Sequence, residues 1–327
     1  MTQDSAQASE IRYGACNLCE AICGLEFHLQ GNEITAIKGD KQDPLSRGHI
    51  CPKAVALKDI YNDPDRLRTP LRRIKTDDGY NFVEISWEEA FDEVAERLLA
   101  IRQQYGANSI GVYQGNPNVH NFGSMTHAQQ LFKPLGTKNR FSATSVDQLP
   151  HQLVSMWMFG HQLLVPIPDI DHTQYFLMLG ANPMASNGSL MTVPDFRNRL
   201  KALQGRGGKL VVIDPRLTET AEVADEHLFI RPGTDAALLA AILNTLFEEG
   251  LVDPGKLAAF TDGLDTVRDS IKGFTAERAA DITGIDAESI RRLAREFAAA
   301  DGAVCYGRMG VSVQRFGTLC QWLIQLI

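Results

Sequence analysis

The chain has 327 residues, of which 44% are hydrophobic and 22% charged, and it carries a formal net charge of -8 at pH 7. A globular protein of this composition is long enough to bury two or more hydrophobic cores. The acidic balance argues against a general nucleic-acid binder, because such proteins need a basic surface. No apolar run approaches the roughly 20 residues that a membrane-spanning helix requires, so we expect no membrane span.

The first eleven residues are polar and acidic, without an apolar signal core or a pair of adjacent arginines. We therefore expect a cytoplasmic protein, unless a signal was removed ahead of this sequence. Six cysteines are present, and four of them lie between positions 16 and 51. In a reducing compartment such a grouping favours a metal site over disulfides.

These four cysteines follow the pattern C-x2-C-x3-C-x27-C. Three thiolates on one tight loop and a fourth from a distant position suit a [4Fe–4S] cluster, which takes four soft sulfur ligands. Zinc is the alternative, although structural zinc sites usually pair two C-x2-C arms. The predicted ligands are Cys16, Cys19, Cys23 and Cys51.

Two further features of the cysteine pattern allow more than one interpretation. Lys53 follows the last ligand by two residues, and it is either an ordinary surface lysine or a fixed positive charge beside the cluster. Cys305 and Cys320 stand in apolar surroundings, so we predict that both are buried core thiols.

The N-terminal part reads as a small β-rich module. Residues 24–29 and 33–39 alternate between apolar and polar side chains around a Gly31-Asn32 turn, which predicts a hairpin. Residues 63–85 are rich in arginine and proline and are predicted to be extended. Ser86 and Glu89 form a capping box that opens a helix, which Gly106 ends.

From about residue 140 the pattern becomes α/β. Apolar strands alternate with amphipathic helices, which predicts βαβ units and a parallel sheet covered on both faces. The predicted strands are residues 175–180, 209–213, 227–230 and 303–306, and the predicted helices are 194–204, 236–249 and 290–299. The final apolar helical segment, residues 319–327, ends without a cap, so we expect the natural chain to continue.

Three of these strands end in polar turns. Ligands of open α/β sheets bind at the carboxyl ends of strands, where glycine, arginine and asparagine can contact a phosphate, pyrophosphate or base. One such turn is ordinary, because any βα turn uses glycine and proline. Three in succession indicate a nucleotide-like ligand, although neither G-x-G-x-x-G nor a P-loop is present. The turns are residues 180–183, 214–218 and 231–235.

Together these features resemble the molybdopterin oxidoreductase family, the dimethyl sulfoxide reductase superfamily that includes formate dehydrogenases and nitrate reductases. The resemblance runs from about residue 12 to 327 and rests on four motifs in order. They are the cysteine pattern with C-P-K, L-G-A-N-P at 179–183, V-V-I-D-P-R-L-T-E-T-A at 211–221 and I-R-P-G-T-D-A-A-L at 230–238.

The resemblance implies a bis(molybdopterin guanine dinucleotide) cofactor that holds molybdenum or tungsten beside the [4Fe–4S] cluster. It also implies a small β-rich iron–sulfur domain followed by nested, doubly wound parallel α/β domains, with a C-terminal barrel domain missing from this chain. The expected domains are residues 1–62 for the cluster, 63–140 plus 303–327 for a first, incomplete α/β domain, and 141–302 for an inserted Rossmann-like domain that binds the guanine dinucleotide.

Particular residues take roles by the same resemblance. The four cysteines bind the cluster, and Lys53 lies between cluster and pterin. The positions that match the family's cofactor contacts are Gly180, Asn182, Asp214, Arg216, Gly233, Asp235, Gly307 and Gly310.

The protein ligand of the metal is where this sequence departs from several subfamilies. Formate dehydrogenases and periplasmic-type nitrate reductases use cysteine or selenocysteine there, but no cysteine lies between Cys51 and Cys305. Ser145 stands nearest the expected position, with Asp147 second, and either would be a hard oxygen ligand. The alternative is that Ser142, Thr144 and Ser145 only bond their own backbone.

The resemblance therefore implies an oxidoreductase. A small substrate would react at the metal in a two-electron step, and the electrons would pass the pterin and Lys53 to the cluster and then to a redox partner protein or subunit. Two alternatives remain. One is an electron-relay subunit that has lost molybdenum, and the other is a non-redox hydratase of the same fold.

Overall fold

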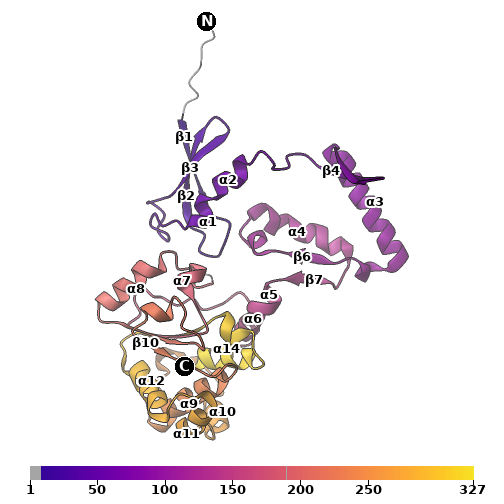
Figure 1. Cartoon of the computed structure of the whole chain (residues 1–327). Helices are drawn as coiled ribbons and strands as arrows, with labels where there is room; N and C mark the ends of the chain where they lie inside the picture. The colour runs from indigo at the N-terminus through magenta and orange to yellow at the C-terminus, as the bar shows by residue number, and fades with distance from the viewer. Residues whose placement is uncertain (1–8, 189) are drawn as a thin grey trace. The chain divides into compact units, whose positions relative to one another are not determined.

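The computed structural model describes residues 9–188 and 190–327. They belong to two compact units, Met1–Ala143 (unit 1) and Thr144–Ile327 (unit 2), which are drawn in Figure 1. None of the helices in the described part of the chain has the length and hydrophobicity needed to cross a membrane.

Unit 1 begins with an antiparallel sheet in the order β1-β2-β3. The predicted hairpin is confirmed as β2 and β3, which pair from Leu25 with Gly39 to Gln30 with Glu33. Two short helices follow, and their apolar side packs on the sheet around Leu25 and Ile37. The elements are β1 (Ser9–Ala15), β2 (Gly24–Gln30), β3 (Glu33–Gly39), α1 (Pro52–Val55) and α2 (Leu57–Asn62).

The rest of unit 1 contains a hairpin, two longer helices and a parallel strand pair. Residues 71–84, predicted as extended, form the hairpin β4–β5. The capping box is confirmed, because Ser86 Oγ accepts from Glu89 N at 3.1 Å and Ser86 N donates to Glu89 Oε2 at 2.9 Å. The elements are β4 (Leu71–Thr76), β5 (Gly79–Glu84), α3 (Trp87–Tyr105), η1 (Ala107–Ser109), β6 (Val112–Gln114), η2 (Asn116–Val119), α4 (Phe122–Leu135) and β7 (Arg140–Ser142).

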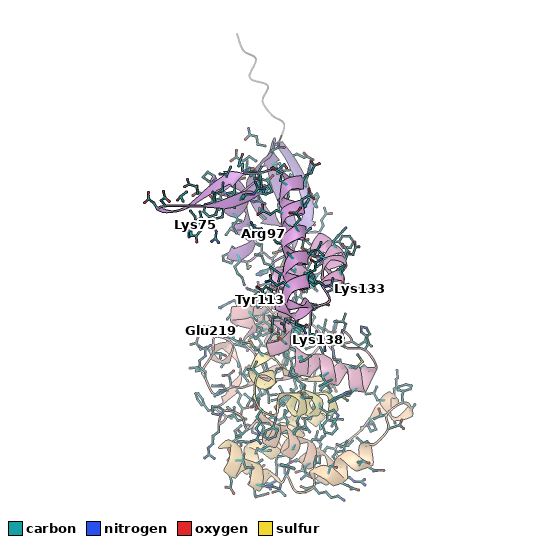
Figure 2. All side chains as sticks on the ribbon, turned by 90° about the vertical axis from the view of Figure 1, so that its right-hand side faces the viewer. Lys75, Arg97, Tyr113, Lys133, Lys138 and Glu219 are labelled. Carbon is teal, nitrogen blue, oxygen red and sulfur yellow. The ribbon has the colours of Figure 1, made fainter. Side chains whose placement is uncertain are left out.

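The apolar side of α3 is exposed within the described part of unit 1. Phe91 is 64% and Val94 57% exposed. They line a hollow of about 630 Å³ together with Trp87, Leu98 and Leu131. Arg97 on the same helix and Lys75 on β4 are labelled among the side chains of this unit in Figure 2.

Unit 2 is built on a parallel sheet in the order β10-β9-β8-β11. The four predicted strands are confirmed within two residues of their expected bounds. The chain moves outward from β8 through β9 to β10 and then returns to the other side of β8, so the strand order reverses between β8 and β11. The strands are β8 (Tyr175–Leu179), β9 (Lys209–Ile213), β10 (Glu226–Leu228) and β11 (Ala303–Gly307).

Helices cover both faces of this sheet, as predicted. Alternate strand residues point to opposite faces, so Leu177 and Val211 enter one core and Phe176 and Leu210 the other. Helices α9 to α12 lie on one side and α7 and α8 on the other (Figure 1). The helices are α5 (Thr144–Asp147), α6 (Leu149–Phe159), α7 (Pro183–Ser186), α8 (Phe196–Gly205), η3 (Ala221–Val223), α9 (Asp235–Glu248), η4 (Gly255–Ala259), α10 (Leu264–Ile271), α11 (Ala276–Thr283), α12 (Ala287–Ala299), α13 (Met309–Ser312) and α14 (Gly317–Leu326).

The C-terminal residues differ from the expected grouping. Residues 303–327 were expected to join residues 63–140, but β11 pairs with β8 from Ala303–Tyr175 to Gly307–Leu179. Helix α14 buries Cys320, Leu323 and Ile324 in the core that contains α9. Strand hydrogen bonds and apolar burial therefore place these residues in unit 2. The other expected domain boundaries stay predictions.

The two cysteines outside the motif differ in burial. Cys320 is completely buried, as predicted, and burial raises the pKa of its thiol to about 12. Cys305 on β11 is only partly buried and packs at the edge of the same core.

Candidate functional site

Three of the motif cysteines lie on one tight loop between β1 and β2 of unit 1. Cys16 N donates to Cys23 O at 2.8 Å, and Ile22 N donates to Cys19 O at 3.2 Å. Ile22 has a φ of 43°, a left-handed conformation that a β-branched residue rarely adopts. This strained turn is what holds three sulfur atoms on so short a segment.

The fourth cysteine returns to this loop from α1. Cys51 is the N-cap residue of α1, and Pro52 occupies the first helical position. Ala54 of α1 is buried in the same small core as Cys16 and Cys23, and Cys19 and Cys51 pack against that core. The structure thus brings together all four predicted ligands, two of them buried and two partly exposed.

The four thiols also share one electrostatic environment. Burial raises the pKa of Cys23 to about 12, and the neighbouring Cys19, Cys16 and Cys51 add to the rise. Burial likewise raises the pKa of Cys16, while the positive charge of Lys53 opposes it. Lys53 is therefore close enough to Cys16 to act on it electrostatically, and its role beside a bound cluster stays a prediction.

This donor set fits a [4Fe–4S] cluster, which binds each cysteine through a different iron. The raised pKa values of Cys16 and Cys23 favour their protonated thiols, so a bound cluster has to displace the protons of these two side chains. Residues 9–188 and 190–327 contain no group of three His, Cys, Asp or Glu side chains arranged to hold a single metal ion.

In unit 2, the glycines at the carboxyl ends of β8 and β11 touch one another. Gly180 has a φ of +55°, and a Cβ atom there would lie 2.8 Å from Cα of Gly310. Gly310 N donates to Gly180 O at 2.9 Å. A Cβ on Gly307 would overlap Ile324 and Val311. These glycines thus have a packing role, and their predicted contact with a cofactor stays a prediction.

Asn182 joins the turn after β8 to the turn after β9. Its Oδ1 accepts from Thr220 Oγ1 at 2.7 Å and Thr220 N at 3.2 Å, and its Nδ2 donates to Glu219 Oε2 at 2.7 Å. Thr220 Oγ1 in turn accepts from Met184 N at 3.1 Å. The side chain of Asn182 therefore fixes the two turns to each other; Glu219 is labelled in Figure 2.

The turns after β9 and β10 carry the predicted acidic residues. Asp214 Oδ1 accepts from Arg216 N at 2.9 Å. Asp235 is only 6% exposed, and its Oδ2 accepts from Gln314 Nε2 at 2.8 Å. Burial raises the pKa of Asp235, and the charge of Asp214 adds to the rise despite the Gln314 hydrogen bond. Asp214 and Asp235 are thus neighbours at one edge of the sheet.

Two features of this edge fit a ligand that carries hydrogen-bond donors, such as a guanine base. Gln314 Oε1 is buried and has no hydrogen-bond partner in the described part of the chain. Gly233 has a φ of +80°, and its Cβ position is open, with nothing within 4 Å. Gly180 and Gly310 are packed against each other, whereas Gly233 has open space beside it.

The predicted metal-ligand segment forms α5, at the start of unit 2. Ser145 is exposed there. Asp147 forms an ion pair with Arg308, whose Nη2 lies 3.5 Å from Asp147 Oδ2, and Arg308 Nη1 donates to Asp147 O at 3.3 Å. Since Arg308 directly follows β11, the structure brings α5 to the carboxyl end of that strand.

Sequence reasoning did not identify several residues of this region. Glu219 and Thr220 lie in the motif at 211–221 without a predicted role, and Gln314 lies outside every motif. Their hydrogen bonds to predicted residues become visible only in the folded chain. His151 on α6 is a lone histidine among apolar residues, which in a sequence indicates nothing more than a core position. Arg308 had one signal, its place in the Gly307-Arg308-Met309-Gly310 turn.

Two family models match the chain. The model described as molybdopterin oxidoreductase Fe4S4 domain matches residues 11–63, and the one described as molybdopterin oxidoreductase matches residues 66–284. The chain belongs to the molybdopterin oxidoreductase family. The predicted resemblance is thereby confirmed, and the first match spans all four motif cysteines.

Two relatives and one solved structure support this membership. Formate dehydrogenase H of Escherichia coli is 31% identical over 91% of this chain, and a nitrate reductase of Symbiobacterium thermophilum is 30% identical over 94%. Acetylene hydratase from Pelobacter acetylenicus has the same fold, with a TM-score of 0.77 and 26% identity over 96% of this chain. The chain spans 41% of each of the two relatives and 42% of the hydratase.

Proposed function

We propose that this chain holds the [4Fe–4S] cluster and part of the pterin site of a molybdenum or tungsten oxidoreductase that uses bis(molybdopterin guanine dinucleotide). In this proposal, a small substrate is converted in a two-electron reaction and the electrons are exchanged with a redox partner protein or subunit. When bound, the metal supplies the two-electron chemistry and the cluster stores electrons one at a time.

The observation that carries the proposal is the cysteine arrangement in a chain of this family. Cys16, Cys19, Cys23 and Cys51 converge from a strained loop and a helix start onto one small core. Lys53 acts electrostatically on Cys16. The left-handed conformation of Ile22 is unfavourable for a β-branched residue, and it is kept at the turn that places Cys16, Cys19 and Cys23 on one short segment.

In this proposal each group of residues has its own task. The four cysteines hold the cluster, and Lys53 keeps a positive charge beside it that favours the reduced state. Asp214, Asp235, Gly233 and Arg216 hold the guanine dinucleotide at the strand ends, while Gly180, Asn182, Gly307 and Gly310 keep the adjoining turns in place. Ser145 provides a hard oxygen ligand for the metal.

One observation favours a second candidate, a non-redox hydratase. The solved structure with a TM-score of 0.77 is named an acetylene hydratase. Such an enzyme would need the same cysteine module and strand-end turns, so these residues alone do not separate the two functions.

Metal, iron and pterin analysis of the full-length protein tests the first candidate. We expect about four irons per chain, molybdenum or tungsten, and pterin fluorescence after oxidation. Iron without molybdenum, tungsten or pterin would instead support an electron-relay subunit and contradict the proposal. Substrate turnover that needs no electron acceptor would favour the hydratase.

A further inference from the structure

Arg308 joins two segments of unit 2 that are 161 residues apart in sequence. Its guanidinium contacts both the carboxylate and the backbone carbonyl of Asp147, at 3.5 and 3.3 Å. Both side chains are largely shielded from solvent, with 13% of Arg308 and 22% of Asp147 exposed. Solvent and salt screen an ion pair in such surroundings less than they screen an exposed surface pair.

The backbone of Arg308 is itself held firmly. Arg308 N donates to Leu179 O at 3.2 Å, which ties it to the end of β8. The next turn packs on Gly180 through Gly310, where no Cβ atom would fit. The guanidinium therefore extends from the point where the strand order reverses, which is where open α/β sheets bind their ligands.

His151 lies close to this ion pair. It is only 2% exposed, and its Nε2 has no hydrogen-bond partner in the described part of the chain. Burial and the charge of Arg308 lower the pKa of His151 to about 4, so its ring is neutral at neutral pH. A neutral His151 therefore adds no second positive charge near Arg308.

We propose that Arg308 is a positioning residue that holds α5, and with it Ser145, against the turn of Gly307 and Gly310. This rests on the proposed function, in which Ser145 is the protein ligand of the metal. Arg308 would set the place of that ligand without touching the metal itself. It connects the segment that carries the metal ligand with the turn predicted to lie near the pterin.

Unit 2 offers a matched control. Arg199 forms an ion pair with Asp171 and donates through Nε to Pro194 O at 3.0 Å, so it also contacts a carboxylate and a backbone carbonyl. Its side chain is 12% exposed, against 13% for Arg308. The two arginines thus have similar burial and similar types of partner at different places in unit 2.

The first test needs no cofactor and uses hydrogen–deuterium exchange of the full-length protein. Gln148 N donates to Thr144 O at 3.1 Å, so its amide reports whether α5 is formed. We expect Arg308→Met, and more mildly Arg308→Lys, to speed exchange at residues 144–148 at least tenfold, while Arg199→Met leaves it unchanged. Unchanged exchange in both Arg308 variants, or an equal rise in Arg199→Met, would overturn the proposal.

The second test uses the cofactor-loaded full-length protein. We expect Arg308→Lys to change the paramagnetic resonance signal of the metal and to lower kcat about 10–100-fold with KM less affected. Asp147→Asn should do the same, and Arg199→Lys should do neither. A metal signal identical to the wild type in both Arg308→Lys and Asp147→Asn would overturn the proposal.

The two proposals fail in distinguishable ways. If the wild-type protein binds no molybdenum, tungsten or pterin, the proposed function fails while the exchange result still decides whether Arg308 holds α5. If the wild-type protein binds them and only the Arg308 tests fail, the proposed function stands and the positioning role is wrong.

Discussion

The two units arrange their predicted cofactor residues in opposite ways. In unit 1, four side chains from one motif converge, and the chain adopts a strained turn at Ile22 to let them do so. In unit 2, several of the predicted strand-end residues use their contacts on neighbouring protein groups. Asn182 bonds Thr220 and Glu219, and Gly180 packs on Gly310.

This difference shows that a motif match can mark either a residue that binds a ligand directly or a residue that only shapes the site. A cysteine ligand has to present its own sulfur atom, so its position in the motif and its role in the fold coincide. A residue in a strand-end turn can serve a ligand indirectly, because it shapes the backbone that the ligand contacts. Unit 2 also has residues of the first kind, since the Cβ position of Gly233 is open and Gln314 Oε1 has no hydrogen-bond partner among the residues that the structure describes.

The largest expected effect is in the cysteine module. Cys19→Ser replaces a soft sulfur donor with a hydroxyl, so we expect it to abolish the visible absorption of the cluster. Cys305→Ala, outside the motif, should leave that spectrum intact. An unchanged spectrum in Cys19→Ser would reject the assignment of Cys19 as a ligand.

A pair of glycine substitutions separates packing from open space at the strand ends. Gly180→Ala adds a Cβ in a left-handed conformation 2.8 Å from Gly310, so we expect the free energy of unfolding to fall by about 2–5 kcal/mol. Gly233→Ala also places a Cβ atom in a left-handed conformation, but that atom meets no neighbour. The free energy of unfolding should therefore fall by only about 1–2 kcal/mol. Denaturant unfolding measures both, and equal losses would contradict the packing role of Gly180.

His151 predicts a specific pH dependence for unit 2. Its pKa is lowered to about 4 by burial and by Arg308, against an ordinary value of 6.5. The unfolded chain therefore takes up a proton at a higher pH than the folded one. Stability is fully present above about pH 6.5 and is lost as the pH falls toward 4, by about 3 kcal/mol.

Unfolding measured between pH 7 and pH 4 checks this expectation. His151→Gln should remove most of that acid sensitivity, whereas His161→Gln, at an exposed position, should retain it. If the free energy of unfolding of His151→Gln fell with decreasing pH as steeply as that of the wild type, the burial of a neutral His151 would not be the cause of the acid sensitivity.

The smallest expected effects come from helix caps, one in each unit. Ser86 caps α3 in unit 1, and Asp286 Oδ1 accepts from Ser289 N at 2.9 Å to cap α12 in unit 2. Ser86→Ala and Asp286→Ala should each lower stability by about 1 kcal/mol. Hydrogen exchange should show lower amide protection only in the unit that contains the substitution. An equal loss of protection in both units would argue against two separate units.

The sequence predicted the sheet of unit 2 well for a physical reason. Strands such as residues 175–179 are continuous apolar runs between turn residues, and a strand buried on both faces has no other pattern. Hairpin β4–β5 was missed, although Asp78-Gly79 is a hairpin turn signal. The arginine-rich composition of residues 63–85 outweighed that signal.

Other features could not be predicted, because they depend on contacts between distant residues. The Arg308–Asp147 ion pair joins residues 161 positions apart, and nothing local marks either as a partner of the other. The pairing of β11 with β8 follows from the return of the chain across the sheet. The apolar face of α3 is exposed in unit 1, and a pattern of apolar residues does not say what covers such a face.

If the cysteine module and the strand-end turns belong to one redox enzyme, as we propose, the full-length protein holds both an iron–sulfur cluster and molybdenum or tungsten. A redox titration of the full-length protein followed by electron paramagnetic resonance tests it most directly. We expect two signals in one sample, one from the reduced [4Fe–4S] cluster and one from molybdenum or tungsten. A cluster signal alone, at every potential and in protein shown to be folded, would contradict it.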